Sequence, residues 1–265
     1  MKILILQIED RNDSKLNNFM NYNKLICNKY NIEYIYKKKS RVMVPPYWGK
    51  IYEIYEIMKE KPSLDYIMWL DSDAFFFNYN NDRFHNFIKK YSKYSMIFTK
   101  DMPPWRGEFN AGVFIIKNDE IGQNIIKEWL SHYNPNNWKY ENMVWTTNTK
   151  WAGDSYEQGS FIKYIKNNNK FINNIIQLPY FYLNNNNCEN NTNDTITVHL
   201  AAFHKNNYNT IYKCLRKNKM NISHDYFTFT NYNTNTIDIY KILKIIILFI
   251  LLFVLVKKLR LLIKY

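Results

Sequence analysis

The chain has 265 residues, of which 46% are hydrophobic and 18% aromatic, enough for the core of one sizeable domain with an appendage. This composition excludes a chain that is disordered throughout. The formal net charge of +13 suits nucleic acid, an anionic membrane or a phosphate-bearing substrate. The lysines are scattered and no nucleic-acid-binding motif accompanies them, so we expect no nucleic acid as a partner.

Residue usage is strongly biased. Asn, Ile, Lys and Tyr are abundant while Gly and Pro are scarce, a pattern that follows A/T-rich codons and indicates an A/T-rich genome, such as that of a large DNA virus. The three cysteines, Cys27, Cys188 and Cys214, lack metal-ligand spacing and cannot all pair. They exclude a disulfide framework, although Cys188 and Cys214 could pair in an oxidising compartment.

Strands and helices are predicted to alternate along the chain. In the first part, apolar runs and helical spacing predict a strand at 2–8, a helix at 14–30, a strand at 32–37, a helix at 47–60 and a fully buried strand at 64–70. Further strands are expected at 94–100, 111–117 and 195–201, with helices at 121–133 and 156–166. This alternation is typical of an α/β fold with a mostly parallel central sheet, whose sites lie at the carboxyl ends of the strands. We place the folded domain at residues 1–217 and an Asn- and Tyr-rich linker at 218–238.

The C-terminal segment, residues 239–265, predicts a membrane helix with a basic tail. Its unbroken apolar run from Ile245 to Val256 would span about 18 Å as a helix, so a crossing of the roughly 30 Å hydrocarbon core needs snorkelling lysines or local thinning. A buried helix is the alternative, but apolar residues here occupy every face. We expect a single-pass or tail-anchored protein of a Golgi-like endomembrane or of a virion membrane.

The membrane topology has two readings. More basic residues follow the apolar run than precede it, which favours a cytoplasmic C-terminus. The apolar stretch at the N-terminus is too short for the core of a signal peptide, and this favours a tail-anchored protein with a cytoplasmic domain.

Two acids end the most apolar strand. In "YIMWLDSDAFFF", Asp71 and Asp73 follow the predicted buried strand, at the edge where an open α/β sheet builds its site. Two carboxylates this close repel each other unless a cation lies between them, and Mn²⁺ or Mg²⁺ prefers oxygen ligands. The pair predicts a metal that also holds a diphosphate. An Asp-x-Asp turn can also be a simple helix-capping turn, so the pattern needs support from the rest of the chain.

That support comes from an ordered set of blocks. They are "YWGKIYEI", "LDYIMWLDSDAFFFN", "FNAGVFIIKN", "YEQGSFIKYI", "LPYFYLN" and "TVHLAAFHK", together covering roughly residues 45–205. In this set the chain resembles GT-A nucleotide-diphospho-sugar glycosyltransferases, in particular the Golgi α-galactosyl-, α-mannosyl- and xyloglucan xylosyltransferase family, and more distantly glycogenin-like enzymes. The resemblance implies a Rossmann-like GT-A fold.

The resemblance also implies a metal and donor site. Asp71 and Asp73 match the metal- and donor-binding acids, and His199 matches the histidine that completes the metal site. Lys205 matches a lysine that binds the donor's phosphates, although Ala202 stands where a glycine is usual. Without the resemblance, a lone histidine such as His199 is more often a satisfied core residue.

Further matched positions surround the sugar. The resemblance places Asn110 and Gly112 beside the donor sugar, and Glu157 and Gln158 near the transferred sugar and the acceptor, as catalytic candidates. Glu157 stands where the family usually has Asp. Lys50 matches a Trp-x-Lys feature, for which a lysine on the helix surface is an equal alternative.

The function implied is a metal-dependent transfer of a hexose or pentose from a UDP- or GDP-sugar to a glycan, protein or lipid, with retention at the anomeric carbon. A non-catalytic sugar-nucleotide-binding protein of the same fold is one alternative. A phosphatase of the haloacid-dehalogenase type is another, but it normally has its Asp-x-Asp near the N-terminus and Thr or Val where this chain has Phe75.

Overall fold

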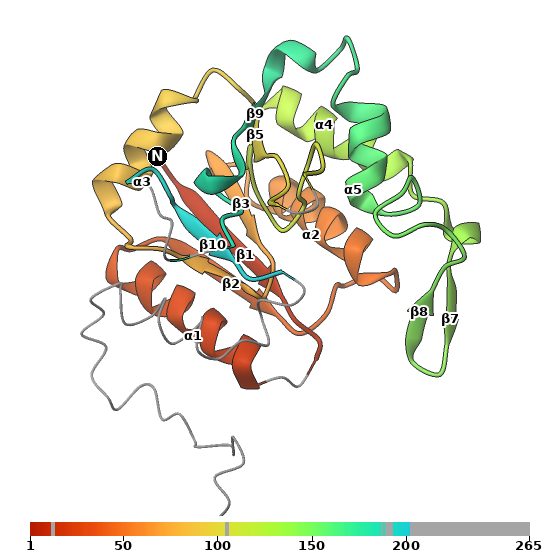
Figure 1. Cartoon of the computed structure of the whole chain (residues 1–265). Coiled ribbons are helices and arrows are strands. Elements are labelled where there is room, and N and C mark those ends of the chain that lie inside the picture. Colours follow the sequence, from red (N-terminus) through yellow and green to blue (C-terminus); the bar gives the residue numbers. More distant parts are fainter. Residues whose placement is uncertain (12–13, 104–105, 187, 189–192, 202–265) are drawn as a thin grey trace, which may run out of the picture. The chain divides into compact units, whose positions relative to one another are not determined.

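The computed structural model describes residues 1–11, 14–103, 106–186, 188 and 193–201 (Figure 1). The chain divides into two units, Met1–Met220 and Asn221–Tyr265, and every described residue lies in the first. The predicted linker at 218–238 and membrane segment at 239–265 therefore lie outside the described residues. Within the described ranges, none of the helices has both the length and the apolar character that crossing a membrane requires.

The predicted strands and helices form close to their expected bounds. The strands are β1 (Ile3–Ile8), β2 (Glu33–Lys37), β3 (Tyr66–Leu70), β4 (Ala74–Phe76), β5 (Met96–Thr99), β6 (Val113–Lys117), β7 (Lys139–Glu141), β8 (Val144–Thr146), β9 (Ile175–Leu178) and β10 (Thr197–His199). The α-helices are α1 (Ser14–Lys29), α2 (Pro46–Glu60), α3 (Asn81–Lys90), α4 (Glu120–Ser131) and α5 (Glu157–Ser160). A π-helix, η2 (Phe161–Ile165), continues α5, and the 3₁₀ turns are η1 (Pro135–Asn137), η3 (Ile172–Asn174) and η4 (Tyr180–Tyr182).

The central sheet has the strand order β2-β1-β3-β6-β5-β9. β1 pairs in parallel with β2 and β3, and β5 pairs in parallel with β9, which confirms a mostly parallel α/β sheet. β6 runs antiparallel to both of its neighbours, β3 and β5. The apolar pattern of its sequence predicts a strand but not the direction in which that strand pairs. Because its first residue, Val113, lies opposite Leu70 at the end of β3, the turn before β6 reaches the edge where Asp71 follows.

Helices cover both faces of the sheet (Figure 1). Alternate residues of β1 and β3, among them Leu6 and Trp69, join one apolar core with α2 and α4. Gln7 follows Leu6 in β1, so its side chain points to the opposite face of the sheet, where it accepts a hydrogen bond from Asn23 of α1. The site is therefore built on strands that are packed from both sides, which keeps their ends rigid.

A second, short ribbon is decisive for the site. β4 pairs antiparallel with β10, with Ala74 opposite His199. Phe75 of β4 is fully buried and stacks on Phe19 of α1, with ring centroids 5.1 Å apart. This packing holds the ribbon beside the main sheet, so two segments far apart in the sequence meet directly after β3.

Candidate functional site

The Asp-Ser-Asp turn is fixed through its backbone. The amide of Asp71 donates to the carbonyl of Gly112 at 2.7 Å, and its carbonyl accepts from Ala74 at 2.9 Å and from the Gln7 side chain at 3.0 Å. The carbonyl of Asp73 accepts from the amide of Leu200 at 3.0 Å. The turn is thus tied to β1, to the turn before β6 and to the end of β10, and both carboxylates start from a rigid backbone.

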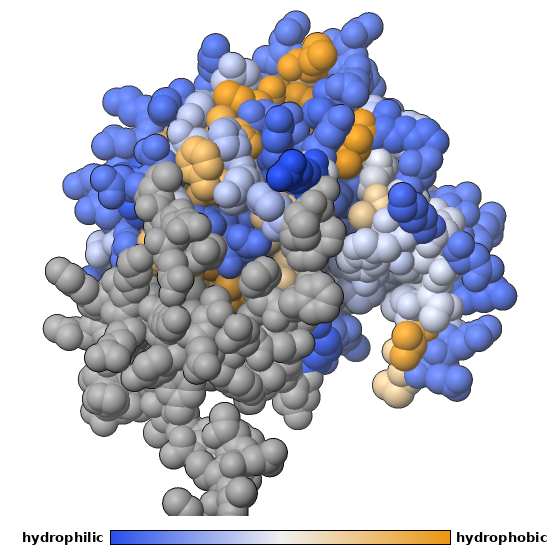
Figure 2. All heavy atoms as spheres, viewed as in Figure 1, coloured by the Kyte–Doolittle hydropathy of each residue, from blue (hydrophilic) through white to orange (hydrophobic). Residues whose placement is uncertain are grey.

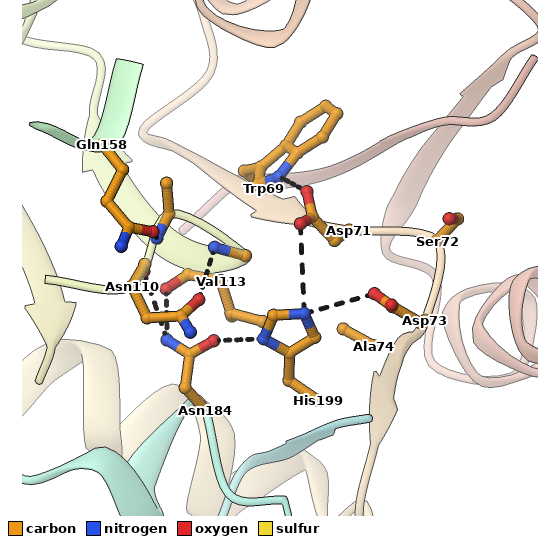
Figure 3. Close-up of polar contacts among 12 residues, drawn as sticks. Trp69, Asp71, Ser72, Asp73, Ala74, Asn110, Val113, Gln158, Asn184 and His199 are labelled. Atoms are coloured by element: carbon orange, nitrogen blue, oxygen red, sulfur yellow. Dashed lines mark hydrogen bonds and ion pairs between the residues drawn. The ribbon is translucent and has the colours of Figure 1, made fainter. Parts of the chain in front are cut away.

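The structure brings the three predicted metal ligands together (Figure 3). The Nε2 atom of His199 lies 3.2 Å from Oδ1 of Asp73 and 3.9 Å from Oδ2 of Asp71. One ligand atom from each residue lies within 4.8 Å of the others. His199 is 3% exposed and Asp73 7%, so water screens their charges weakly.

Asn184 orients the imidazole of His199 (Figure 3). Its amide nitrogen donates to Oγ1 of Thr99 at 2.8 Å and to the carbonyl of Val113 at 3.1 Å. These acceptors identify the nitrogen of the amide, so its oxygen is the atom that lies 2.8 Å from Nδ1 of His199. Nδ1 therefore carries the hydrogen, and Nε2 points at the two aspartates as a metal-binding histidine requires.

The Asn-x-Gly turn serves the same histidine. A Cβ atom at Gly112 would overlap the imidazole ring of His199, so only glycine fits there. Asn110 is 7% exposed and shapes the turn, since its Oδ1 accepts from the amide of Gly112 at 2.8 Å and its Nδ2 donates to Asp101 at 2.7 Å. Gln158 joins the same turn by accepting from the amide of Ala111 at 3.0 Å.

Lys50 anchors the other side of Asp71. Its Nζ atom lies 3.0 Å from Oδ1 of Asp71 and 3.1 Å from Oε1 of Glu157, and it donates to the carbonyl of Ala111 at 3.1 Å. The indole of Trp69 donates to the same Oδ1 at 2.7 Å. Oδ1 of Asp71 is thereby occupied, which leaves Oδ2 to face His199. The Lys50 side chain is 6% exposed, so the interpretation of a surface lysine is wrong.

The buried charges shift one another's proton affinities. Burial alone would lower the pKa of Lys50, but Asp71 and Glu157 outweigh it and raise that pKa above its usual range. Burial raises the pKa of Glu157, against the opposing effect of Lys50. For His199, burial would lower the pKa, yet Asp73 and then Asp71 raise it. The acids thus attract positive charge to Nε2, where a proton or a metal ion can supply it.

The donor set fits a divalent cation. Two carboxylates and one oriented imidazole nitrogen form a convergent group, and oxygen ligands together with one histidine suit Mn²⁺, or Mg²⁺ with more difficulty because of the nitrogen. Lys205, predicted to bind the donor's phosphates, lies outside the described residues, as does Ala202.

Ser72, between the two acids, binds the end of β1. Its hydroxyl donates to Oε2 of Glu9, and Nη2 of Arg11 lies 2.6 Å from the same oxygen and donates to Oγ of Ser72 at 3.2 Å. Glu9 is 4% exposed, whereas the Arg11 side chain is 54% exposed. No role was predicted for Glu9, Arg11 or Asn184, although Asn184 ends the matched block "LPYFYLN", because each acts through a contact between distant segments.

We predict that Asn184→Ala weakens Mn²⁺ binding roughly 10- to 100-fold, because the variant removes the acceptor that holds the imidazole with Nε2 toward the acids. Titration calorimetry or electron paramagnetic resonance of Mn²⁺ measures this. The exposed Asn136→Ala is the matched control and should bind Mn²⁺ as the wild type does. Equal Mn²⁺ affinity in all three proteins would contradict the orienting role.

We predict that Lys50→Met destabilises the fold by about 3 kcal/mol, because it leaves the buried Glu157 carboxylate and part of Asp71 without their cation. The double variant Lys50→Met with Glu157→Gln should recover part of this loss, since one uncompensated charge is gone. Urea unfolding followed by tryptophan fluorescence measures the free energy of unfolding of the double variant and of each single variant, Lys50→Met and Glu157→Gln. A double variant whose loss equals the sum of the two single losses would show that Lys50 and Glu157 do not interact.

Comparisons with known proteins relate part of the chain to galactosyltransferases. The galactosyl transferase GMA12/MNN10 family matches residues 2–103, a range that contains Lys50, Asp71 and Asp73. The chain is 40% identical over 68 residues to the probable alpha-1,2-galactosyltransferase gmh1 of Schizosaccharomyces pombe, covering 26% of this chain and 20% of that protein. It is 27% identical over 115 residues to galactomannan galactosyltransferase 1 of Cyamopsis tetragonoloba, covering 40% and 25%. The matches thus span a quarter or less of the length of these curated relatives.

A solved structure extends the similarity over the fold. The crystal structure of a glycosyltransferase involved in the glycosylation of the major capsid of PBCV-1 superposes with a TM-score of 0.58 at 16% identity, covering 78% of this chain and 96% of that one. At this identity the likeness establishes the fold alone. The resemblance drawn from the sequence is therefore confirmed: residues 2–103 match the galactosyl transferase GMA12/MNN10 family, and the chain has a glycosyltransferase fold.

Proposed function

We propose that this chain is a metal-dependent glycosyltransferase that moves a hexose or pentose from a UDP- or GDP-sugar to a glycan, protein or lipid acceptor with retention of configuration. The observation that carries the proposal is the convergence of Asp71, Asp73 and His199 at the carboxyl end of β3. The names of the two curated relatives favour galactose as the transferred sugar.

The chemistry of the donor explains why such a site is needed. Negative charge accumulates on the β-phosphate as the bond to the anomeric carbon breaks, and the leaving diphosphate departs slowly unless that charge is neutralised. A bound divalent cation would supply this neutralisation as a Lewis acid. Oδ2 of Asp71, a carboxylate oxygen of Asp73 and Nε2 of His199 are the atoms that would hold it.

The remaining polar residues keep these ligands in place. Lys50 and Trp69 bind one oxygen of Asp71 and so fix the direction of the other, while Asn184 and Gly112 set the orientation and the space of the imidazole. A preorganised site needs little rearrangement as charge develops, and that preorganisation is a main source of rate enhancement in enzymes.

Glu157 is proposed to act through Lys50. It is 4% exposed and its carboxylate bonds the Lys50 ammonium, which lowers its reactivity toward a sugar carbon. These observations favour a positioning role for Glu157 over attack on the sugar. In a retaining transfer the acceptor hydroxyl would then approach on the face from which the diphosphate leaves. Gln158 of α5, whose side chain accepts from the amide of Ala111, is proposed to contact the transferred sugar.

We predict that UDP or GDP raises the melting temperature of the full chain only when Mn²⁺ is present, because the diphosphate and the acids share the cation. Asp73→Ala should abolish this shift and Mn²⁺-dependent hydrolysis of UDP-galactose, while the exposed Asp82→Ala retains both. Differential scanning fluorimetry and UDP release measure the two effects. Full activity of Asp73→Ala, or activity in the presence of a chelator, would refute the metal site. Metal-dependent binding of UDP without turnover would instead indicate a non-catalytic binding protein.

A further inference from the structure

Four aromatic rings form one continuous cluster beside Glu157, which we call the aromatic wall: Tyr47, Trp138, Trp151 and Tyr156. The centroid of Tyr47 lies 5.8, 5.4 and 5.0 Å from those of Trp138, Trp151 and Tyr156, and Trp151 and Tyr156 are 4.9 Å apart. Trp138 and Tyr156 are buried, whereas Trp151 is 66% exposed. The wall thus runs from the core of the protein to solvent.

The exposed indole is presented by a fixed turn. The amide of Gly153 donates to the carbonyl of Lys150 at 3.0 Å, and Ala152 takes the left-handed conformation with φ of 55°. A Cβ atom at Gly159 would overlap the carbonyl oxygen of Gly153, so the turn lies directly against α5. Trp151 is therefore held in relation to the helix that begins with Glu157.

The wall is continuous with the proposed catalytic site. Tyr47 and Lys50 are three residues apart on α2 and lie on the same face, and Tyr156 directly precedes Glu157. Burial, and after it the negative charge of Glu157, raises the pKa of Tyr47. Lys50 in turn contacts both Glu157 and Asp71. The exposed Trp151 is therefore linked through Tyr47 and Tyr156 to the group that anchors Asp71, one of the candidate metal ligands.

The surface of this region is of intermediate hydropathy and borders an exposed apolar tip. In Figure 2 it is pale over the segment between β8 and α5, and orange at the tip of the β7–β8 hairpin below, where Met143 and Val144 are exposed. Aromatic side chains with hydroxyl groups provide apolar area together with hydrogen-bonding atoms, and none of the four side chains of the wall carries a charge at neutral pH. These are properties of a surface that binds an uncharged, hydroxyl-rich ring.

We propose that Tyr47, Trp151 and Tyr156 form an acceptor subsite that binds a neutral saccharide, whose apolar ring face packs on the Trp151 indole and whose hydroxyl groups face the tyrosines. This inference rests on the proposed function, because it makes the acceptor a carbohydrate rather than a protein side chain or a lipid. Pockets for such ligands combine aromatic area with a few polar groups, as this wall does.

The test measures saccharide and nucleotide binding separately on the full chain. The saccharide probes are mannotetraose, cellotetraose and maltotetraose, whose dissociation constants come from saturation-transfer NMR; the nucleotide probe is UDP with Mn²⁺. The variants are Trp151→Ala, the conservative Trp151→Phe, and Met143→Ala as the matched control, since Met143 is apolar, 87% exposed and outside the wall.

For a tetraose that the wild type binds, Trp151→Ala should raise the dissociation constant roughly tenfold, and Trp151→Phe should recover most of the affinity. Met143→Ala should match the wild type, and all variants should bind UDP equally. Unchanged saccharide binding in Trp151→Ala, or no binding of any tetraose to the wild type, would overturn the subsite. A matching loss of UDP binding in Trp151→Ala would also overturn it, by assigning the indole to the nucleotide base. Failure of the wild type to bind UDP with Mn²⁺ would refute the proposed function instead.

Discussion

The repulsion between two neighbouring carboxylates is the constraint on which the site depends. Asp71 and Asp73 follow a strand that is buried along its whole length, where water cannot screen their charges fully. Positive or hydrogen-bond-donating groups offset this repulsion. Lys50 and Trp69 bind one oxygen of Asp71, and His199 lies near both acids. Oδ2 of Asp71 and Oδ1 of Asp73 both face Nε2 of His199. This arrangement brings the repulsive pair together with a histidine nitrogen in a group that could hold a cation.

Long-range pairing makes that arrangement possible. His199 lies on β10, and only the antiparallel ribbon with β4 carries it to the Asp-Ser-Asp turn. Around the ribbon, residues that are not themselves candidate ligands have exact spatial requirements, such as the missing Cβ of Gly112 and the engaged amide of Asn110. The antiparallel direction of β6 matters for the same reason, because it places the turn that contains Gly112 at the end of β3. The geometry of the site therefore depends on the fold, because the packing of β4 on α1 holds the ribbon that carries His199.

Residue patterns within short segments predicted the secondary structure of those segments. The buried strand before Asp71, the helical spacing of α2 and the α/β alternation follow from periodicity, and the structure bears them out. The resemblance to glycosyltransferases predicted that His199 joins the acids, and the ribbon brings it there. Asn184 and the Glu9–Ser72 contact escaped prediction, because each depends on which distant segment becomes a neighbour. For Lys50, the sequence left two interpretations equal, and burial against Asp71 decided between them. The predictions for Lys205 and for residues 239–265 lie outside the described residues and stay predictions.

The central claim is that the Asp71–Asp73–His199 cluster binds a divalent metal through one histidine nitrogen and carboxylate oxygens. X-ray absorption at the manganese edge tests it most directly, on the full chain loaded with one equivalent of Mn²⁺ and on His199→Gln. The account predicts an oxygen-rich shell with the outer-shell scattering of a single imidazole in the wild type, and loss of that imidazole scattering in the variant. A wild-type spectrum without imidazole scattering, or one that His199→Gln leaves unchanged, would contradict the account.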